Sequence, residues 1–280
     1  MSASLTAIVL LAALMHALWN ALVKSSPDRL IELTGVNLAA GLAAAVALPF
    51  VGFPGRESIP FLAGTMLVHI AYYVLLLLSY ARGGLSLVYP IARGSSPIFV
   101  AALSGLVVGE TLDLMQWLGV GLIAVSIASL AFSGGLRVLG SRAVLFSLAT
   151  GVSIAAYTLI DGAGARVART PTSYIVCLFI MNAFPMLAAP ALMRRGVALE
   201  RFRAQWKTAL LGGLFSFLAY GLAIWVMTRG AIALVAALRE TSVVLAAVIG
   251  ATFLHEPFGR FRVIASLGVA AGIIVLRLAS

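Results

Sequence analysis

Ten apolar stretches, each about as long as a membrane-spanning helix, follow one another along the chain. A helix of about 20 apolar residues crosses the hydrocarbon core of a bilayer. The stretches cover residues 4–23, 30–51, 60–80, 85–108, 115–132, 142–161, 172–193, 207–228, 231–254 and 261–279. Charged residues make up 10% of the 280 positions, whereas a soluble domain carries about 25%. The sequence therefore predicts an all-α polytopic membrane protein with ten transmembrane helices.

The chain also contains an internal repeat. An offset of 146 residues joins three pairs of residues of the same type, Arg93 with Arg239, Ser96 with Ser242, and Glu110 with Glu256. The repeats predicted from this offset are residues 1–135 and 140–280, with five spans each. Because five is odd, the second repeat must enter the membrane in the inverted orientation. Inverted repeats that enclose a site near the membrane midplane are a recurrent transporter architecture.

Two segments at equivalent places in these repeats carry a family resemblance. The first reads RGGLSLVYPIARGSSP (82–97) and is followed by Gly109-Glu110; the second reads RGAIALVAALRETS (229–242) and is followed by HEP at 255–257. Together with the ten-span layout, they resemble the drug/metabolite transporter superfamily, EamA type, over essentially the whole chain. The resemblance implies a multi-pass secondary carrier of the inner (plasma) membrane, often an exporter of amino acids or other small metabolites.

The sequence departs from the common family pattern at three charged residues near the middle of predicted spans, Arg93, Arg239 and Glu240. A charge at this depth costs about 3 to more than 10 kcal/mol unless it faces a partner or a water-filled cavity. On a helix, Arg93 shares one face with Tyr89 and Ser96. Arg239 and Glu240 point about 100° apart, so we expect Glu240 to pair with Arg93 instead. These residues are predicted to bind an anionic or zwitterionic substrate; a purely structural salt bridge between the repeats is the alternative.

Polar and aromatic residues of three other spans complete the predicted substrate site. They are His16, Trp19 and Asn20 in the first span, His69, Tyr72 and Tyr73 in the third, and Tyr157 in the sixth. We expect them to line a cavity, and a histidine such as His69 can titrate near neutral pH and couple transport to protons. Packing and hydrogen bonding between helices are the alternative role for the whole set.

Basic residues are distributed unevenly among the predicted loops. Of the 19 lysines and arginines, 12 lie in one set of loops and 5 in the other. The positive-inside rule places the richer set in the cytoplasm and both termini outside, whereas the family resemblance implies cytoplasmic termini, which we adopt. Because the excess of basic charge reflects topology, it does not predict nucleic-acid binding. The longest loop, 194–205, is predicted to lie along the lipid headgroups.

The predicted function follows from these features and from what the sequence lacks. It contains no HExxH motif, nucleophile elbow or acidic metal-binding pair, so neither an enzyme nor a cofactor is predicted. Glu110 and Glu256 are predicted to cap the fifth and tenth spans. We expect a secondary transporter, acting as an exporter, that moves a small polar metabolite such as an amino acid or organic anion by alternating access. Its partners would be the substrate, the lipid bilayer and a coupling proton, and the chain would act as a monomer or homodimer.

A flippase or scramblase of lipids or lipid-linked intermediates is the alternative function. In that case, the two arginines would meet lipid headgroups through a lateral groove. Transport of water-soluble solutes and scrambling of labelled lipid distinguish the two functions.

Overall fold

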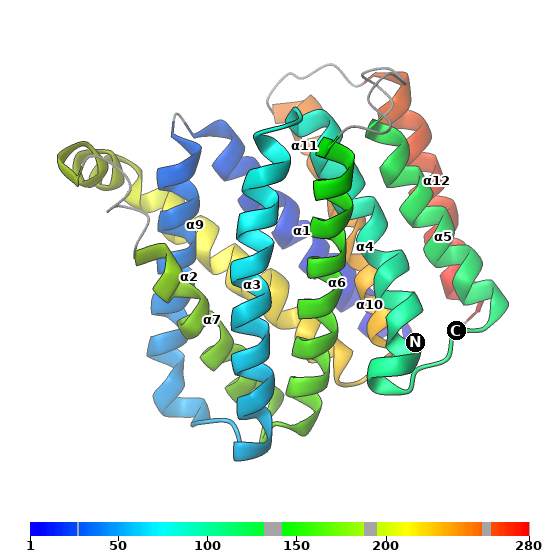
Figure 1. Cartoon of the computed structure of the whole chain (residues 1–280), viewed down its shortest axis with the longest axis horizontal. Helices are drawn as coiled ribbons and strands as arrows, with labels where there is room; N and C mark the ends of the chain where they lie inside the picture. The colour runs from blue at the N-terminus through cyan, green and yellow to red at the C-terminus, as the bar shows by residue number, and fades with distance from the viewer. Residues whose placement is uncertain (27, 132–141, 188–194, 254–258, 280) are drawn as a thin grey trace.

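The computed structural model describes the chain except for residue 27, residues 132–141, 188–194 and 254–258, and residue 280. Every regular element in the described part is a helix (Figure 1). The helices are α1 (Ala3–Ser25), α2 (Arg29–Val51), the short 3-10 helix η1 (Arg56–Ser58), α3 (Ile59–Tyr80), α4 (Leu85–Val108), α5 (Leu114–Ser129), α6 (Arg142–Val167), α7 (Pro171–Leu187), α9 (Arg195–Met227), α10 (Ile232–Arg239), α11 (Thr241–Phe253) and α12 (Arg260–Leu278).

The predicted all-α membrane architecture is confirmed at this level. Eight spans in the described residues are long and apolar enough to cross a bilayer, counting α10 and α11 together, and α5 and α7 are shorter apolar helices. Large apolar side chains point outward from the bundle: Phe50 and Leu106 expose 86% and 85% of their surface. Since lipid tails are as apolar as leucine, a bundle in a membrane gains little by burying such side chains.

The structure differs from the predicted spans in three places. The predicted span 231–254 is interrupted at Glu240, which separates α10 from α11. The loop predicted at 194–205 is instead helical from residue 195 and continuous with α9. Its Ala, Leu, Glu, Arg and Gln residues favour a helix, and polarity alone does not end one. The end of α6 also differs, because this helix continues beyond residue 161 to Val167.

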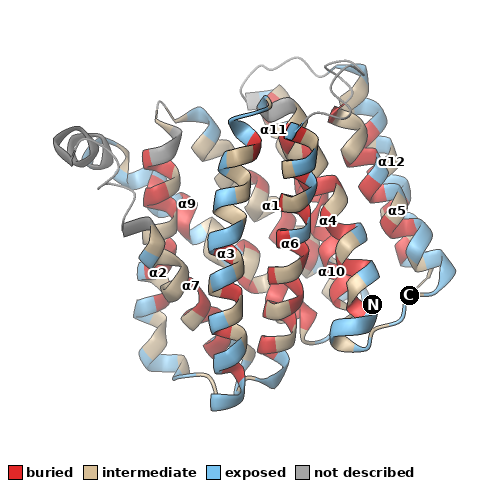
Figure 2. Cartoon of the chain, in the orientation of Figure 1, coloured by how far each residue is buried: buried red, intermediate tan, exposed pale blue. Residues whose placement is uncertain are grey.

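The two halves of the chain are interleaved. In Figure 1, α5 and α12 form one side of the bundle, and α2, α7 and α9 lie toward the other. In the middle of the bundle, α3 and α4 pack on α6. The pair α10–α11 packs on α1, and so does α9. The short helix α10 lies in the interior, and all of its residues are buried (Figure 2). The termini meet at one end, where Arg277 Nη1 donates a hydrogen bond to the Met1 carbonyl oxygen at 2.8 Å.

Close packing of α4 on α5 depends on Gly94. A Cβ atom at this position would lie 2.8 Å from the Ala128 nitrogen and 2.9 Å from the Ala124 carbonyl oxygen. Because backbone cannot move aside locally, we expect Gly94→Ala to destabilise the protein by about 1–3 kcal/mol, measured by thermal unfolding in detergent. Gly121→Ala on α5 is the control, since a Cβ there meets nothing within 4 Å. Equal melting temperatures for the two variants would contradict this packing.

Candidate functional site

The interruption between α10 and α11 places a cluster of polar residues inside the bundle. The Glu240 N–H donates to the Ala237 carbonyl at 3.1 Å, and the Val243 N–H donates to the Glu240 carbonyl at 3.0 Å. These bonds span three residues rather than the four of an α-helix. The following residues, Thr241 and Ser242, are of types that favour helix starts over helix interiors. The chain therefore ends one helix at Arg239 and begins the next two residues later, at bilayer depth.

Arg93 and Glu240 form a buried ion pair between the two halves of the chain. Arg93 Nε lies 2.9 Å from Glu240 Oε2, and the two side chains are 9% and 1% exposed. The predicted pairing is thus confirmed. The Arg93 Nε–H does not point at the carboxylate, however. Arg93 Nε and Glu240 Oε2 both lack a hydrogen-bond partner among the described residues. Charge rather than hydrogen-bond alignment therefore holds the pair at this contact, and both groups keep hydrogen-bonding capacity for another molecule.

His16 lies beside this ion pair and is contacted by two donors. Its Nε2 is 3.4 Å from Arg93 Nη2, and its Nδ1 is 3.3 Å from Trp19 Nε1. Arginine and tryptophan side chains only donate, whereas a neutral imidazole has a single acceptor nitrogen. His16 can therefore accept a hydrogen bond from Arg93 or from Trp19, but not from both at once. The side chains of His16, Arg93 and Trp19 therefore have two alternative hydrogen-bonding arrangements, and a switch between them requires no change of backbone.

Arg239 is a buried cation with spare hydrogen-bonding capacity. It is 3% exposed, and its Cζ lies 5.1 Å from the centroid of the Tyr220 ring. In the described part of the chain, its Nε has no hydrogen-bond partner, and neither do the hydroxyls of Thr241 and Ser242. A buried polar group without a partner costs about 1–3 kcal/mol. Three such groups next to one helix break indicate a place that a polar ligand or water completes.

Aromatic rings connect Arg239 to the third and sixth spans. Tyr220 lies 6.1 Å from Tyr157 between ring centroids, and Tyr157 stacks on His69 at 4.4 Å. Tyr72 packs edge-on against Tyr157 at 5.8 Å, and Tyr73 lies 5.2 Å from Tyr72. His69 Nδ1 also contacts the Thr65 carbonyl oxygen at 2.9 Å. The structure therefore brings together the predicted residues of the third and sixth spans and adds Tyr220, which the sequence did not distinguish from an aromatic of the membrane interface.

Three predicted site residues lie near the ion pair, and two of them bond to the helix backbone. Ser96 Oγ donates to the Arg93 carbonyl at 3.3 Å, and Asn20 Nδ2 donates to the His16 carbonyl at 2.8 Å. Tyr89 lies one turn before Arg93 on α4 and is half-buried. Bonds to the helix backbone satisfy a polar group without requiring a cavity. Ser96 and Asn20 are therefore satisfied without a ligand.

Asp161 is a buried carboxylate that the sequence placed at a helix end. It has no exposed surface, and it accepts hydrogen bonds from Tyr220 at 2.6 Å and from Tyr174 at 3.0 Å. The predicted sixth span ended at this residue, where a charge is easily solvated. Because α6 continues to Val167, Asp161 is drawn into the bundle instead. The same Tyr220 contacts both Asp161 and Arg239.

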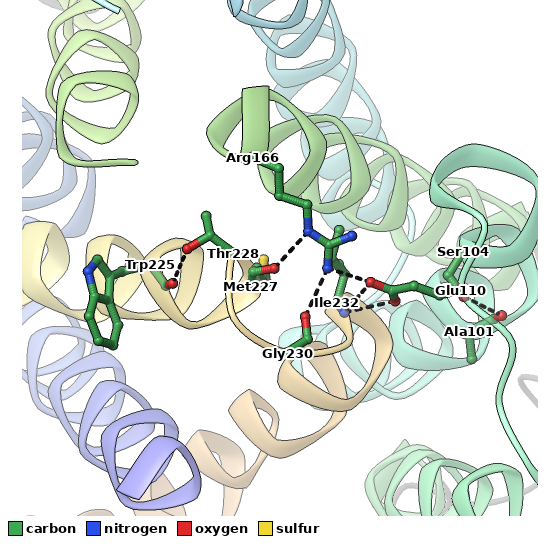
Figure 3. Close-up of polar contacts among 9 residues, drawn as sticks. All are labelled: Ala101, Ser104, Glu110, Arg166, Trp225, Met227, Thr228, Gly230 and Ile232. Carbon is green, nitrogen blue, oxygen red and sulfur yellow. Dashed lines mark hydrogen bonds and ion pairs between the residues drawn. The ribbon is translucent and has the colours of Figure 1, made fainter. Parts of the chain in front are cut away.

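A second ion pair joins the halves at one end of the molecule, between Glu110 and Arg166 (Figure 3). Both Glu110 carboxylate oxygens accept from the backbone N–H of Ile232, at 3.0 and 2.9 Å. Arg166 also donates to the carbonyls of Met227 at 3.0 Å and Gly230 at 2.9 Å. This cluster, which we call the end cluster, ties the end of α4 to the ends of α6, α9 and α10.

The prediction that Glu110 caps the fifth span is wrong. α5 begins at Leu114 and is capped by Asp113, which forms a reciprocal capping box with Gln116. Glu110 caps α10 of the other half instead, because the chain turns away from α4 after Gly109. Glu256, predicted to cap the tenth span, lies outside the described residues. Among those residues, no group of three or more His, Cys, Asp or Glu side chains could hold a metal ion.

Comparison with known proteins supports the two-part layout. A family model described as the EamA-like transporter family matches residues 4–132 and 141–278. No curated protein matches the chain. A solved structure titled "Crystal structure of protein" is 18% identical, covers 99% of this chain and 98% of its own, and superposes with a TM-score of 0.73. At that identity, the likeness shows the fold alone.

Proposed function

The chain belongs to the EamA-like transporter family, and on that premise we propose that it exports a small polar metabolite, such as an amino acid or an organic anion, by alternating access. The main support for a substrate with an anionic group is the buried Arg239, which has spare donors and no ion pair among the described residues. A carboxylate or another anionic group fits such a donor. The family identifies the chain as a membrane transporter, and we place it in the inner membrane.

The ten-span architecture with two inverted repeats, residues 1–135 and 140–280, is part of this proposal. Its support is the reciprocity of the helix contacts. The packing of α3 and α4 on α6 is matched by the packing of α9 and α10–α11 on α1, while α2 packs on α7 and α5 on α12. A two-fold relation between halves produces such matched pairs. α10 and α11 together then correspond to α4, and the helix break lies at the equivalent depth to Arg93.

Discontinuous helices are where many secondary transporters bind their substrates, because half-helix ends expose backbone and dipole charge. The interruption at Glu240 supports a binding site there. The residues of the proposed site are Arg93, Tyr89, Ser96, Arg239, Glu240, His16, Trp19, Asn20, His69, Tyr72, Tyr73 and Tyr157. Closure of one end while the other opens is the essential requirement of alternating access. The end cluster, which joins the first half to the second, supports a closed end in this conformation.

Release of the end cluster is expected to open this end. Glu110→Gln removes the ion pair with Arg166 and weakens the cap on α10. In a Cys177→Ser background, we expect the variant to raise the labelling rate of Thr228→Cys by a water-soluble maleimide several-fold. Asp113→Asn, which affects only the α5 cap, is the matched control and should leave the rate unchanged. Equal labelling in the two variants would mean that the end cluster does not close the protein.

Orientation gives an independent prediction, because both termini lie at one end. If the family resemblance is the better guide, a reporter fused after Ser280 reads as cytoplasmic. The expected result contradicts the charge count, in which 12 basic residues face the other side. A periplasmic reading would show that positive charge sets the orientation here.

A ligand screen tests the proposed substrate class. A ligand at about 100 times its Kd stabilises a protein by about 2.7 kcal/mol, so a bound solute raises the melting temperature measurably. We expect stabilisation of the purified protein by members of a panel of L-amino acids and organic acids, and loss of that stabilisation in Arg239→Gln. If no member stabilises the protein while it scrambles labelled lipid in vesicles, the flippase function is the correct one.

A further inference from the structure

Asp161 is a charged group inside the bundle that the proposed substrate site leaves unused. It lies on α6 with no exposed surface, and its two oxygens accept from the hydroxyls of Tyr174 on α7 and Tyr220 on α9. No cation lies within ion-pair distance of it among the described residues. The carboxylate is thus held by uncharged donors only.

A carboxylate in this setting has a strong reason to bind a proton. Ionisable groups inside a membrane are costly and mark proton or ion pathways more often than they serve packing. An ionised carboxylate offers about four acceptor sites, of which the hydroxyls of Tyr174, Tyr220 and Thr65 fill three. A bound proton removes the charge, and with it most of the cost of burial.

Every helix packed on α6 carries charged or titratable groups. They include His69 from α3, Tyr89 and Arg93 from α4, Tyr157 from α6 itself, Tyr174 from α7, Tyr220 from α9, Arg239 and Glu240 from the end of α10, and Arg56 and Glu57 from η1. Arg93 and Glu240 neutralise one another, and the two η1 residues are exposed. His69, which stacks on Tyr157, also interacts electrostatically with Asp161. Arg239 has no ion pair among the described residues, and Tyr220 links it to Asp161.

Tyr220 connects the carboxylate to the substrate site. Its hydroxyl donates to Asp161, and its ring lies beneath the Arg239 guanidinium group. When Asp161 takes up a proton, one of its oxygens becomes a hydroxyl that donates. One tyrosine hydroxyl then loses its anionic acceptor. If Tyr220 moves, the position of Arg239 changes with it, so a proton on Asp161 and a substrate anion on Arg239 influence each other.

We propose that Asp161 is a proton-binding site within the membrane and that its proton is the coupling ion of the transport cycle. The coupling role rests on the proposed transport function, whereas proton binding does not. Uptake of the proton converts the carboxylate to a carboxylic acid and breaks no covalent bond; its release to the opposite aqueous side restores the carboxylate. Asp161 thereby replaces His69 as the site at which the coupling proton binds.

Infrared difference spectroscopy during a pH step tests the binding of the proton, with acid itself as the probe. The purified full-length protein in lipid bilayers should gain a carboxylic acid C=O band on acidification. We expect Asp161→Asn to lose this band and the matched control Asp113→Asn, an exposed residue, to keep it. Tyr220→Phe should keep the band at a changed frequency. A spectrum of Asp161→Asn identical to that of the wild type would overturn the proposal.

The link to conformation is tested with the maleimide probe at Thr228→Cys. Divided by the rate of a free thiol such as N-acetylcysteine at the same pH, which removes the dependence on thiolate fraction, the labelling rate should depend on pH in the wild-type background and lose that dependence in Asp161→Asn. If Asp161→Asn does not fold, Asp161→Glu serves instead and should shift the infrared band and the pH dependence without removing them. If the wild-type protein shows the infrared band but transports no solute, the proposed transport function alone is refuted. If it transports solute but shows no band, proton binding by Asp161 alone is refuted.

Discussion

Arg239→Gln is expected to reduce solute uptake into proteoliposomes by about 100-fold while leaving the protein folded. The guanidinium group is buried against Tyr220 without an ion pair in the described part of the chain, so removing it strands no buried carboxylate. A hydrogen bond to a charged group is worth up to about 3 kcal/mol, which corresponds to roughly a 100-fold change in rate. Glutamine keeps part of the side chain's length and a polar amide, but it removes the charge and three of the five N–H donors.

Arg229→Gln is the matched control for this experiment. Arg229 is exposed and lies over the ring of Trp225, with its Cζ 3.7 Å from the ring centroid. The Arg229→Gln variant therefore loses a cation–π contact, as Arg239→Gln does, but this contact lies outside the proposed site. Both variants should melt within a few degrees of the wild type, and only Arg239→Gln should lose uptake. Normal uptake by Arg239→Gln would remove this residue from the substrate site.

The second large effect is expected on stability, from the ion pair of Arg93 with Glu240. Removing one partner of a buried pair costs about 3–5 kcal/mol, because the other charge is left buried and unpaired. Arg93→Gln and Glu240→Gln should each lower the melting temperature strongly, and the double variant should recover most of the loss. Thermal unfolding of the four proteins in one detergent measures this cycle. Losses that simply add in the double variant would mean that the two residues do not interact.

Transport by the double variant separates the two roles of the pair. If the pair is only structural, the refolded double variant transports solute normally. If Arg93 also binds substrate, the double variant is stable and inactive. The incomplete hydrogen bonding of Arg93 Nε and Glu240 Oε2 leads us to expect the second result.

Much of the architecture could be predicted from the sequence. Apolar length located the spans, and α4 has the predicted bounds of residues 85–108. The pairing of Glu240 with Arg93 was also predictable, because two adjacent charges on a helix cannot face one another. Both inferences depend on helix geometry and on the high cost of charge in lipid, which act on any sequence in the same way.

Other features depend on where helices end and were not predictable. The break at Glu240 has no glycine or proline to mark it. Asp161 was assigned to a helix end because the predicted span 142–161 stops there, whereas α6 continues for six more residues. Glu110 was assigned to the nearest helix start in the sequence, whereas tertiary structure presents it to α10. In each case, contacts between distant parts of the chain outweigh the local pattern.

Counterflow with the wild-type protein tests whether the chain transports small polar solutes. Proteoliposomes are preloaded with an unlabelled panel of L-amino acids and organic acids, and the same solutes are supplied outside in labelled form. We expect at least one labelled solute to accumulate transiently above its external concentration, and Arg239→Gln vesicles to show no accumulation. Absence of accumulation for every solute, together with rapid scrambling of labelled lipid in the same vesicles, would contradict the proposed transport function.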